Sequence, residues 1–336
     1  MPIHPSQSSK FHLLEGISSF QEGMSDPVLR ERMDEFMSIR NAPPRPDVAV
    51  RDTTAPGPHG PVPVRIYAPH DAAGDRPALV WMHGGAFMGG DLDMPEADGV
   101  SREIASRAGA VVVSVDYRLA VGGVTYPVPH DDTVAAIRFV RDSAADLGID
   151  AGRIFVGGAS AGGNLAAGAA LRLRDDDGWL PASLLLAYTT THAVVPTPSA
   201  TLAQLMTEVP RLLRFLPADR SFITRNYLGG AESRADGYAM PANAVVDGLC
   251  PVVLLNAEYD DLRASSEAFA AQLALAGVDV RQVMYPGMLH GFLNIPPTIE
   301  PVDRALDLMA GVVGAPAQAL PLNEKVLVDA VAATRS

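Results

Sequence analysis

The sequence has very little cysteine and lysine. A single cysteine, Cys250, among 336 residues excludes an intrachain disulfide and with it a secreted scaffold held by disulfides. We expect this thiol to be buried and structural. Lysine occurs only at Lys10 and Lys325, no basic run is present, and the net charge is −13. Because nucleic acid requires a basic face, we expect no nucleic-acid partner.

Long apolar runs and metal-binding patterns are also missing. No segment reaches the roughly 18 consecutive apolar residues of a membrane-spanning helix, and the first residues lack the features of a secretory signal. The sequence has no H-E-x-x-H pattern, no paired cysteines and histidines, and no EF-hand loop. These absences predict a soluble cytoplasmic protein with no membrane span, no metal and no other cofactor.

The composition, 48% hydrophobic and 19% charged, is typical of a globular protein. Several apolar segments are nearly continuous, as in strands buried on both faces of a parallel sheet. Strand-like segments cover residues 62–67, 78–82, 110–117, 153–156, 183–188, 252–257 and 280–285. Helical patterns lie between them, near 95–108, 131–147, 161–174, 264–276 and 301–312. This alternation predicts a doubly wound α/β domain.

Two segments lie outside the alternation. Residues 12–40 have apolar side chains at helical spacing and end at a proline-rich stretch. Residues 192–245 are helix-like, rich in large apolar side chains, and too long for a simple crossover. We interpret 1–45 as an N-terminal cap segment, 192–245 as a cap insertion, and 46–191 with 246–336 as the catalytic domain.

The strongest chemical motif follows the strand-like segment that ends at Val156. Gly158 and Gly162 bracket Ser160 in a G-x-S-x-G pattern, and a helical pattern begins directly after it. A serine at the tip of a sharp strand-to-helix turn needs small neighbours because the backbone there is crowded. At a helix N-terminus the next amide, that of Ala161, can donate to a developing oxyanion. We predict that Ser160 is a nucleophile.

A second glycine-rich turn, His83-Gly84-Gly85-Ala86, follows the strand-like segment 78–82. Glycines there let bare backbone amides approach a reacting carbonyl, as an oxyanion hole requires. A phosphate-binding turn is the alternative, but both G-x-x-x-x-G-K-[ST] and G-x-G-x-x-G are absent. We predict that an oxyanion hole is formed by Gly84, Gly85 and Ala161.

An acid and a base follow the serine along the chain. Asp260 comes just after the apolar segment 252–257, and His290 follows the last strand-like segment. Carboxyl ends of parallel strands meet at the edge of the sheet where α/β proteins bind ligands. In the order serine, aspartate, histidine, His290 would take the serine proton and Asp260 would hold the imidazole. The neighbouring Asp261 is the rival for the second role.

Together these motifs resemble the hormone-sensitive-lipase-like branch of the α/β hydrolases, a family of bacterial esterases, over about residues 45–295. Further similar segments are Val115-Asp116-Tyr117-Arg118-Leu119-Ala120, Tyr126-Pro127-Val128-Pro129-His130-Asp131-Asp132, and Asp260-Asp261-Leu262-Arg263 with Glu267. The last segment matches Asp260, not Asp261, to the family's acid. The resemblance implies a mostly parallel, eight-stranded sheet flanked by helices. It also implies a helical cap built from an N-terminal segment and an insertion after the sixth strand.

Three features depart from the family pattern. Ala86 stands where the family's H-G-G-G has its third glycine, a replacement that the family tolerates. Ala159 replaces the acidic residue that usually precedes the serine. The segment 121–125 replaces an acidic segment, so we expect a different loop geometry near the site.

The function we predict is hydrolysis of short- to medium-chain carboxylic esters through an acyl-enzyme intermediate. The same triad would also serve an amidase or a lactonase, and a catalytically silent binding protein is the alternative from another class. The partner is a small-molecule ester, whereas the choice between monomer and homodimer stays open. Candidate residues for the substrate pocket are Phe87, Phe36, Met37, His192, Phe215 and Phe222.

Overall fold

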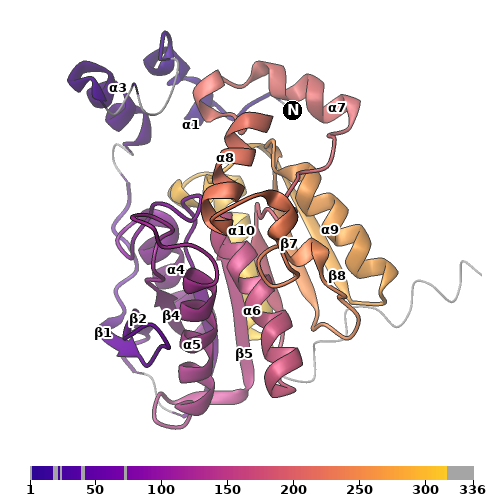
Figure 1. Cartoon of the computed structure of the whole chain (residues 1–336). Coiled ribbons are helices and arrows are strands. Elements are labelled where there is room, and N and C mark those ends of the chain that lie inside the picture. The colour runs from indigo at the N-terminus through magenta and orange to yellow at the C-terminus, as the bar shows by residue number, and fades with distance from the viewer. Residues whose placement is uncertain (1, 18–21, 23–24, 39–41, 72–73, 316–336) are drawn as a thin grey trace, which may run out of the picture.

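The computed structural model describes residues 2–17, 22, 25–38, 42–71 and 74–315. Eight strands form one sheet in the order β1-β2-β4-β3-β5-β6-β7-β8. Strand β2 is antiparallel to both of its neighbours, β1 and β4, and all other neighbouring strands are parallel. The prediction of a mostly parallel, eight-stranded sheet flanked by helices is confirmed (Figure 1).

Seven of the strands match segments predicted from the sequence, and the eighth is β1. The strands are β1 Ala49–Ala55, β2 Val62–Ala68, β3 Arg76–Met82, β4 Val111–Val115, β5 Ile149–Ala159, β6 Leu184–Ala187, β7 Val252–Tyr259 and β8 Val280–Leu289. Strand β1 escaped prediction because it is a mostly exposed edge strand with the polar sequence AVRDTTA. Pairing with β2 along its whole length, and not burial, makes it a strand.

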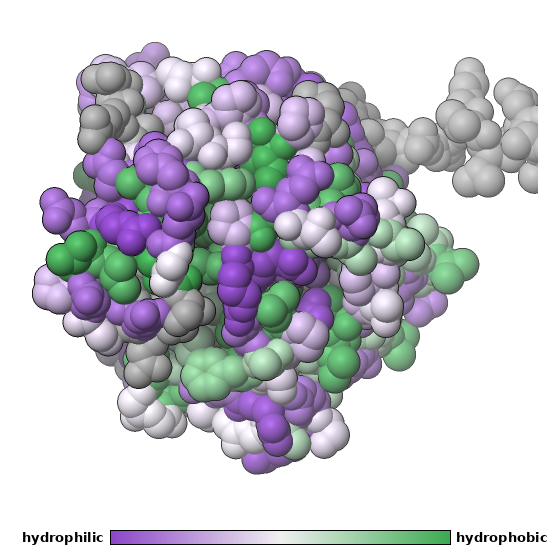
Figure 2. Space-filling view, turned by 90° about the horizontal axis from the view of Figure 1, so that it is seen from above, coloured by the Kyte–Doolittle hydropathy of each residue, from purple (hydrophilic) through white to green (hydrophobic). Residues whose placement is uncertain are grey.

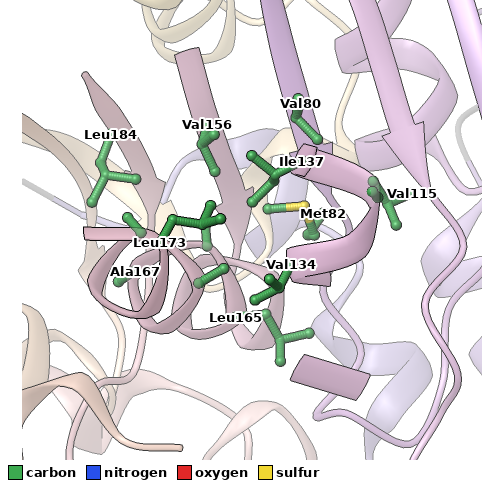
Figure 3. Packing of buried hydrophobic residues seen from close by; sticks show 14 of the residues in the cluster. Val80, Met82, Val115, Val134, Ile137, Val156, Leu165, Ala167, Leu173 and Leu184 are labelled. Atoms are coloured by element: carbon green, nitrogen blue, oxygen red, sulfur yellow. The ribbon is translucent and has the colours of Figure 1, made fainter. Parts of the chain in front are cut away.

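Five helices cover the two faces of the sheet, and successive strand residues alternate between them. Helices α5 (Val128–Asp142), α6 (Ala161–Asp177) and α9 (Arg263–Leu275) pack on one face. Figure 3 shows side chains of α5 and α6 near Val80 and Met82 of β3. Helices α4 (Val100–Ala108) and α10 (Glu300–Gly314) cover the other face, against Leu79 and Trp81. No helix in the described part of the chain is long and apolar enough to span a membrane.

Most of the remaining helices gather at one end of the molecule, above the sheet in Figure 1. They are α1 Pro5–Ser8, η1 Phe11–Leu14, α3 Pro27–Met37, α7 Ala200–Leu205, η3 Met206–Glu208, η4 Arg211–Leu213 and α8 Pro217–Leu228. Of the other short helices, η2 Pro95–Gly99 precedes α4, η5 Glu232–Arg234 and η6 Pro241–Asn243 follow α8, and η7 Phe292–Asn294 follows β8. Seen from above, this end carries its hydrophobic residues as separate groups among hydrophilic ones (Figure 2).

A small apolar cluster holds this end of the molecule to the sheet. It joins Ile3 near the N-terminus, Leu202 and Met206 from the segment between β6 and β7, and Tyr259 and Leu289 from the ends of β7 and β8. The helical pattern predicted over 12–40 is not one helix. Its described parts are η1 and α3, and α3 begins at Pro27 because Asp26 caps its first amides.

Replacing Leu185 by alanine tests the central sheet. Leu185 is fully buried in β6, so its loss leaves a cavity and should lower the free energy of unfolding by about 2–5 kcal/mol. Leu275→Ala, at a side chain 91% exposed, is the matched control and should change that free energy by less than about 0.5 kcal/mol. Urea unfolding measures both, and equal effects would contradict the described packing.

Candidate catalytic site

The turn between β5 and α6 places Ser160 in a strained backbone conformation, with φ at 53°. The turn closes only because two glycines let the backbone cross at short range. A Cβ on Gly158 would lie 2.3 Å from the carbonyl carbon of Gly162, and one on Gly162 would lie 2.2 Å from the carbonyl oxygen of Met82. This packing holds the serine hydroxyl at the amino end of α6 and beside the end of β3.

Ser160, His290 and Asp260 form one hydrogen-bonded chain. Ser160 Oγ lies 3.0 Å from His290 Nε2, and His290 Nδ1 lies 2.8 Å from Asp260 Oδ2. The other carboxylate oxygen of Asp260, which is 1% exposed, accepts the N–H of Leu262 at 2.8 Å. Since a carboxylate can only accept, Nδ1 carries the proton and Nε2 is left to accept from the serine.

Asp261, the other candidate for the acid role, contacts the segment between β6 and β7 instead. Its two carboxylate oxygens accept bonds from Nε and Nη2 of Arg214, both at 2.9 Å. The N–H of Phe215 also donates to it at 2.9 Å. The residue next to Asp260 therefore anchors the segment that crosses above His290.

Two aromatic rings contact the imidazole of His290, and nearby carboxylates favour its charged form. Tyr188 and Phe215 contact the ring edge-on, with centroids at 5.0 Å and 4.8 Å. Burial lowers the pKa of His290, but the charge and hydrogen bond of Asp260, with smaller help from Glu96 and Asp261, outweigh it. The net result is a pKa above the ordinary value for histidine.

The turn after β3 presents two amides beside the serine. Among the described residues, the N–H groups of Gly85 and Ala86 have no hydrogen-bond acceptor. Gly85 has φ of 118°, and a Cβ on it would lie 2.0 Å from the carbonyl oxygen of Gly89. Ala86 and Ala161 both line the pocket that contains Ser160.

Gly84, which the sequence analysis assigns to the oxyanion hole, makes a different contact. Its N–H donates to Glu96 Oε1 at 2.7 Å. Because this N–H is bonded to Glu96, it is not free to donate to an oxyanion. The prediction that Gly84 contributes to the oxyanion hole is therefore corrected. Glycine is still required there, because a Cβ would lie 2.4 Å from the same carboxylate and 3.2 Å from Ser160 Cβ.

Glu96 is a buried residue of the site that the sequence analysis missed. It lies in the short π-helix η2 (Pro95–Gly99), and its side-chain carboxylate is bonded by three different segments. Besides Gly84, Tyr188 Oη donates to it at 2.6 Å and Asn294 Nδ2 at 3.1 Å. The sequence has no signal for it, since a lone glutamate in a helix is usually solvated.

A pocket of about 390 Å³, part of it open to solvent, lies over Ser160. Its wall is mostly apolar and consists of Ala86, Phe87, Ser160, Ala161, Thr190, Val195, Phe215, Arg220, Ile223, Thr224 and Leu262. Phe87 and Phe215 therefore lie where the sequence analysis expects them. Phe222 does not, because it is 63% exposed. Ile223 and Thr224, the next residues on α8, line the pocket. Because successive residues of a helix are rotated by about 100°, the side chain of Phe222 points away from it.

Two further predicted pocket residues, His192 and Phe36, do not line the described wall. His192 lies against α9, where its Nδ1 is 2.9 Å from Ser265 Oγ, and burial lowers its pKa. Phe36 is half-buried on α3, whose carboxyl end is held by Lys10. The side chain of Met37 lies outside the described residues.

Comparisons with known proteins agree on one family. A family model described as alpha/beta hydrolase fold matches residues 79–294. Carboxylesterase NlhH of Mycobacterium tuberculosis is 38% identical over 256 residues, 73% of this chain and 76% of that protein. Esterase LipI of the same organism is 34% identical over 287 residues, 83% and 86% of the two chains. A hyperthermophilic esterase structure from the archaeon Pyrobaculum calidifontis has a TM-score of 0.78 and 33% identity, over 94% and 98% of the chains.

Asp260→Asn tests the electrostatics of His290. Without the carboxylate, burial acts on the imidazole with less opposition, so the pKa of His290 should fall. The pH dependence of the imidazole signals in NMR measures it. Asp261→Asn is the control and should lower the pKa by less, because Asp260 keeps its contact. An equal or larger fall in Asp261→Asn would contradict the assignment of the charge partner.

Proposed function

The chain belongs to the α/β hydrolase fold family, in its hormone-sensitive-lipase-like branch, and from this premise we propose that it is a serine-dependent carboxylic ester hydrolase. The observation that carries the proposal is the hydrogen-bonded chain from Ser160 through His290 to Asp260. A catalytically silent binding protein would have no need of this arrangement. The relatives named above are esterases, which favours esters over the amides and lactones that the same groups could cleave.

In the proposed reaction, Ser160 Oγ attacks the acyl carbon while His290 Nε2 takes its proton. The imidazolium is stabilised by Asp260, whose position is fixed by the amide of Leu262. Amides of Gly85, Ala86 and Ala161 donate to the developing oxyanion. His290 then returns the proton to the leaving alcohol, and water releases the acid from the acyl-enzyme by the same steps in reverse.

Residues 1–45 and 192–245 act in this proposal as a cap over the catalytic domain. The apolar cluster around Leu202 and Met206 and the ion pair between Arg214 and Asp261 support this division. The cap contributes Phe215 and Ile223 to the wall above Ser160. The mostly apolar wall suits an acyl chain, and in this proposal the cap limits that chain to short or medium length.

Ser160→Ala tests the nucleophile. Because the attacking oxygen is lost, kcat for p-nitrophenyl butyrate should fall by about 10⁶-fold, as for the loss of other triad serines. A fluorophosphonate probe should label the unchanged protein at Ser160 and leave the variant unlabelled. The circular dichroism spectrum serves as the control for folding. Labelling that persists in Ser160→Ala would overturn the assignment.

The pair Phe215→Ala and Phe222→Ala tests whether the cap sets chain length. Removing Phe215 enlarges the pocket, so the ratio of kcat/KM for octanoate over butyrate esters should rise by about tenfold. Phe222 is the matched control, since its exposed side chain lies outside the pocket wall. A p-nitrophenyl ester series measures both ratios. Unchanged ratios in both variants would contradict the proposed role of the cap.

A further inference from the structure

The pocket over Ser160 contains one cationic side chain with few partners of its own. Arg220 lies on α8 and lines the same wall as the serine. A guanidinium has five N–H donors. Within the part of the chain that the structure describes, the side chain of Arg220 makes one long hydrogen bond, from Nη1 to the backbone oxygen of Asp261 at 3.4 Å.

The carboxylates nearest to Arg220 are engaged elsewhere. Asp261 pairs with Arg214 through two bonds of 2.9 Å. Asp219 accepts the amide of Leu216 at 3.0 Å and pairs with Arg211 at 3.1 Å. No carboxylate among the described residues lies within ion-pair distance of Arg220. The site therefore holds a positive charge without a protein counter-ion.

The surroundings of Arg220 favour an anionic partner from outside the protein. The remaining wall is apolar except for three hydroxyl side chains, those of Ser160, Thr190 and Thr224. Burial lowers the pKa of Arg220. The charge of Asp261 opposes this shift, that of Arg214 adds to it, and that of Asp219 opposes it, so the pKa stays below the ordinary value for arginine. A half-buried guanidinium in an apolar pocket is stabilised by a carboxylate, which it can bind through two parallel hydrogen bonds.

We propose that Arg220 binds a carboxylate of the substrate, so that the protein prefers esters carrying an acid group remote from the scissile bond. The inference rests on the proposed function, because it places the ester at Ser160. Such substrates are half-esters of dicarboxylic acids or acyl esters of hydroxy acids. With a net charge of −13 the protein does not attract anions as a whole, so recognition depends on this local charge.

Matched charged and uncharged esters test the proposal. On the acyl side, monoethyl glutarate is compared with its isosteric amide, ethyl 5-amino-5-oxopentanoate. On the alcohol side, 4-acetoxybutanoate is compared with 4-acetoxybutanamide. In at least one pair, kcat/KM should be about 10- to 100-fold higher for the carboxylate, as expected for a hydrogen-bonded charged group. The preference should shrink as ionic strength rises.

Variants of Arg220 locate the effect. In Arg220→Gln the ratio of charged to uncharged ester should fall by about 10- to 100-fold, and Arg220→Lys should retain part of it. Because the charged and uncharged esters are compared within each variant, a general change in activity cancels from the ratio. Arg225→Gln is the matched control, because Arg225 lies on the same helix, is exposed, and pairs with Glu232 at 3.6 Å. It should leave the ratio unchanged.

The outcomes separate this inference from the proposed function. Hydrolysis of the uncharged esters without a preference for either carboxylate, or a preference that survives Arg220→Gln, would overturn the role of Arg220 and leave the esterase standing. If no ester were cleaved, calorimetry of glutarate binding to Ser160→Ala would still test the anion site at Arg220. Binding that weakens about tenfold on adding Arg220→Gln supports the anion site, and equal or undetectable binding overturns it.

Discussion

The close approach of two backbones at the end of β5 is the constraint on which the site depends. Gly158 and Gly162 leave no room for side chains, so α6 begins directly against the end of β3. That contact holds Ser160 in its strained conformation with positive φ. It also brings the serine beside the turn at Gly84. A strained position of this kind persists because the buried strands and helices around it over-determine the backbone.

Two carboxylates outside the hydrogen-bonded chain hold the elements that surround it. Glu96 joins the turn after β3 to Tyr188, which follows β6, and to Asn294, which follows β8. Asp261 joins the end of β7 to the segment between β6 and β7 through Arg214. Both carboxylates also help to raise the pKa of His290. The loops around the serine are thus tied together by buried charge as well as by apolar packing.

The positions proposed as catalytic and most of the sheet were accessible from the sequence because their signals are local. Continuous apolar segments identified seven strands, and the bracketing glycines identified Ser160. Contacts between distant segments were not accessible. A lone glutamate resembles a solvated residue until Tyr188 and Asn294 are seen to donate to it. The edge strand β1 was missed because its residues are polar and its pairing is non-local.

The residues alone specify the alternation of strands and helices, the strained turn at Ser160, and the order of acid and base along the chain. Each strand, turn and acid or base position in these features is marked by residue types within its own short segment. Three-dimensional packing was needed to show that Gly84 donates to Glu96, that α8 turns Phe222 outward, and that Arg220 enters the pocket without a counter-ion. Those outcomes depend on the rotation of one element against another, which a local pattern of residues does not specify.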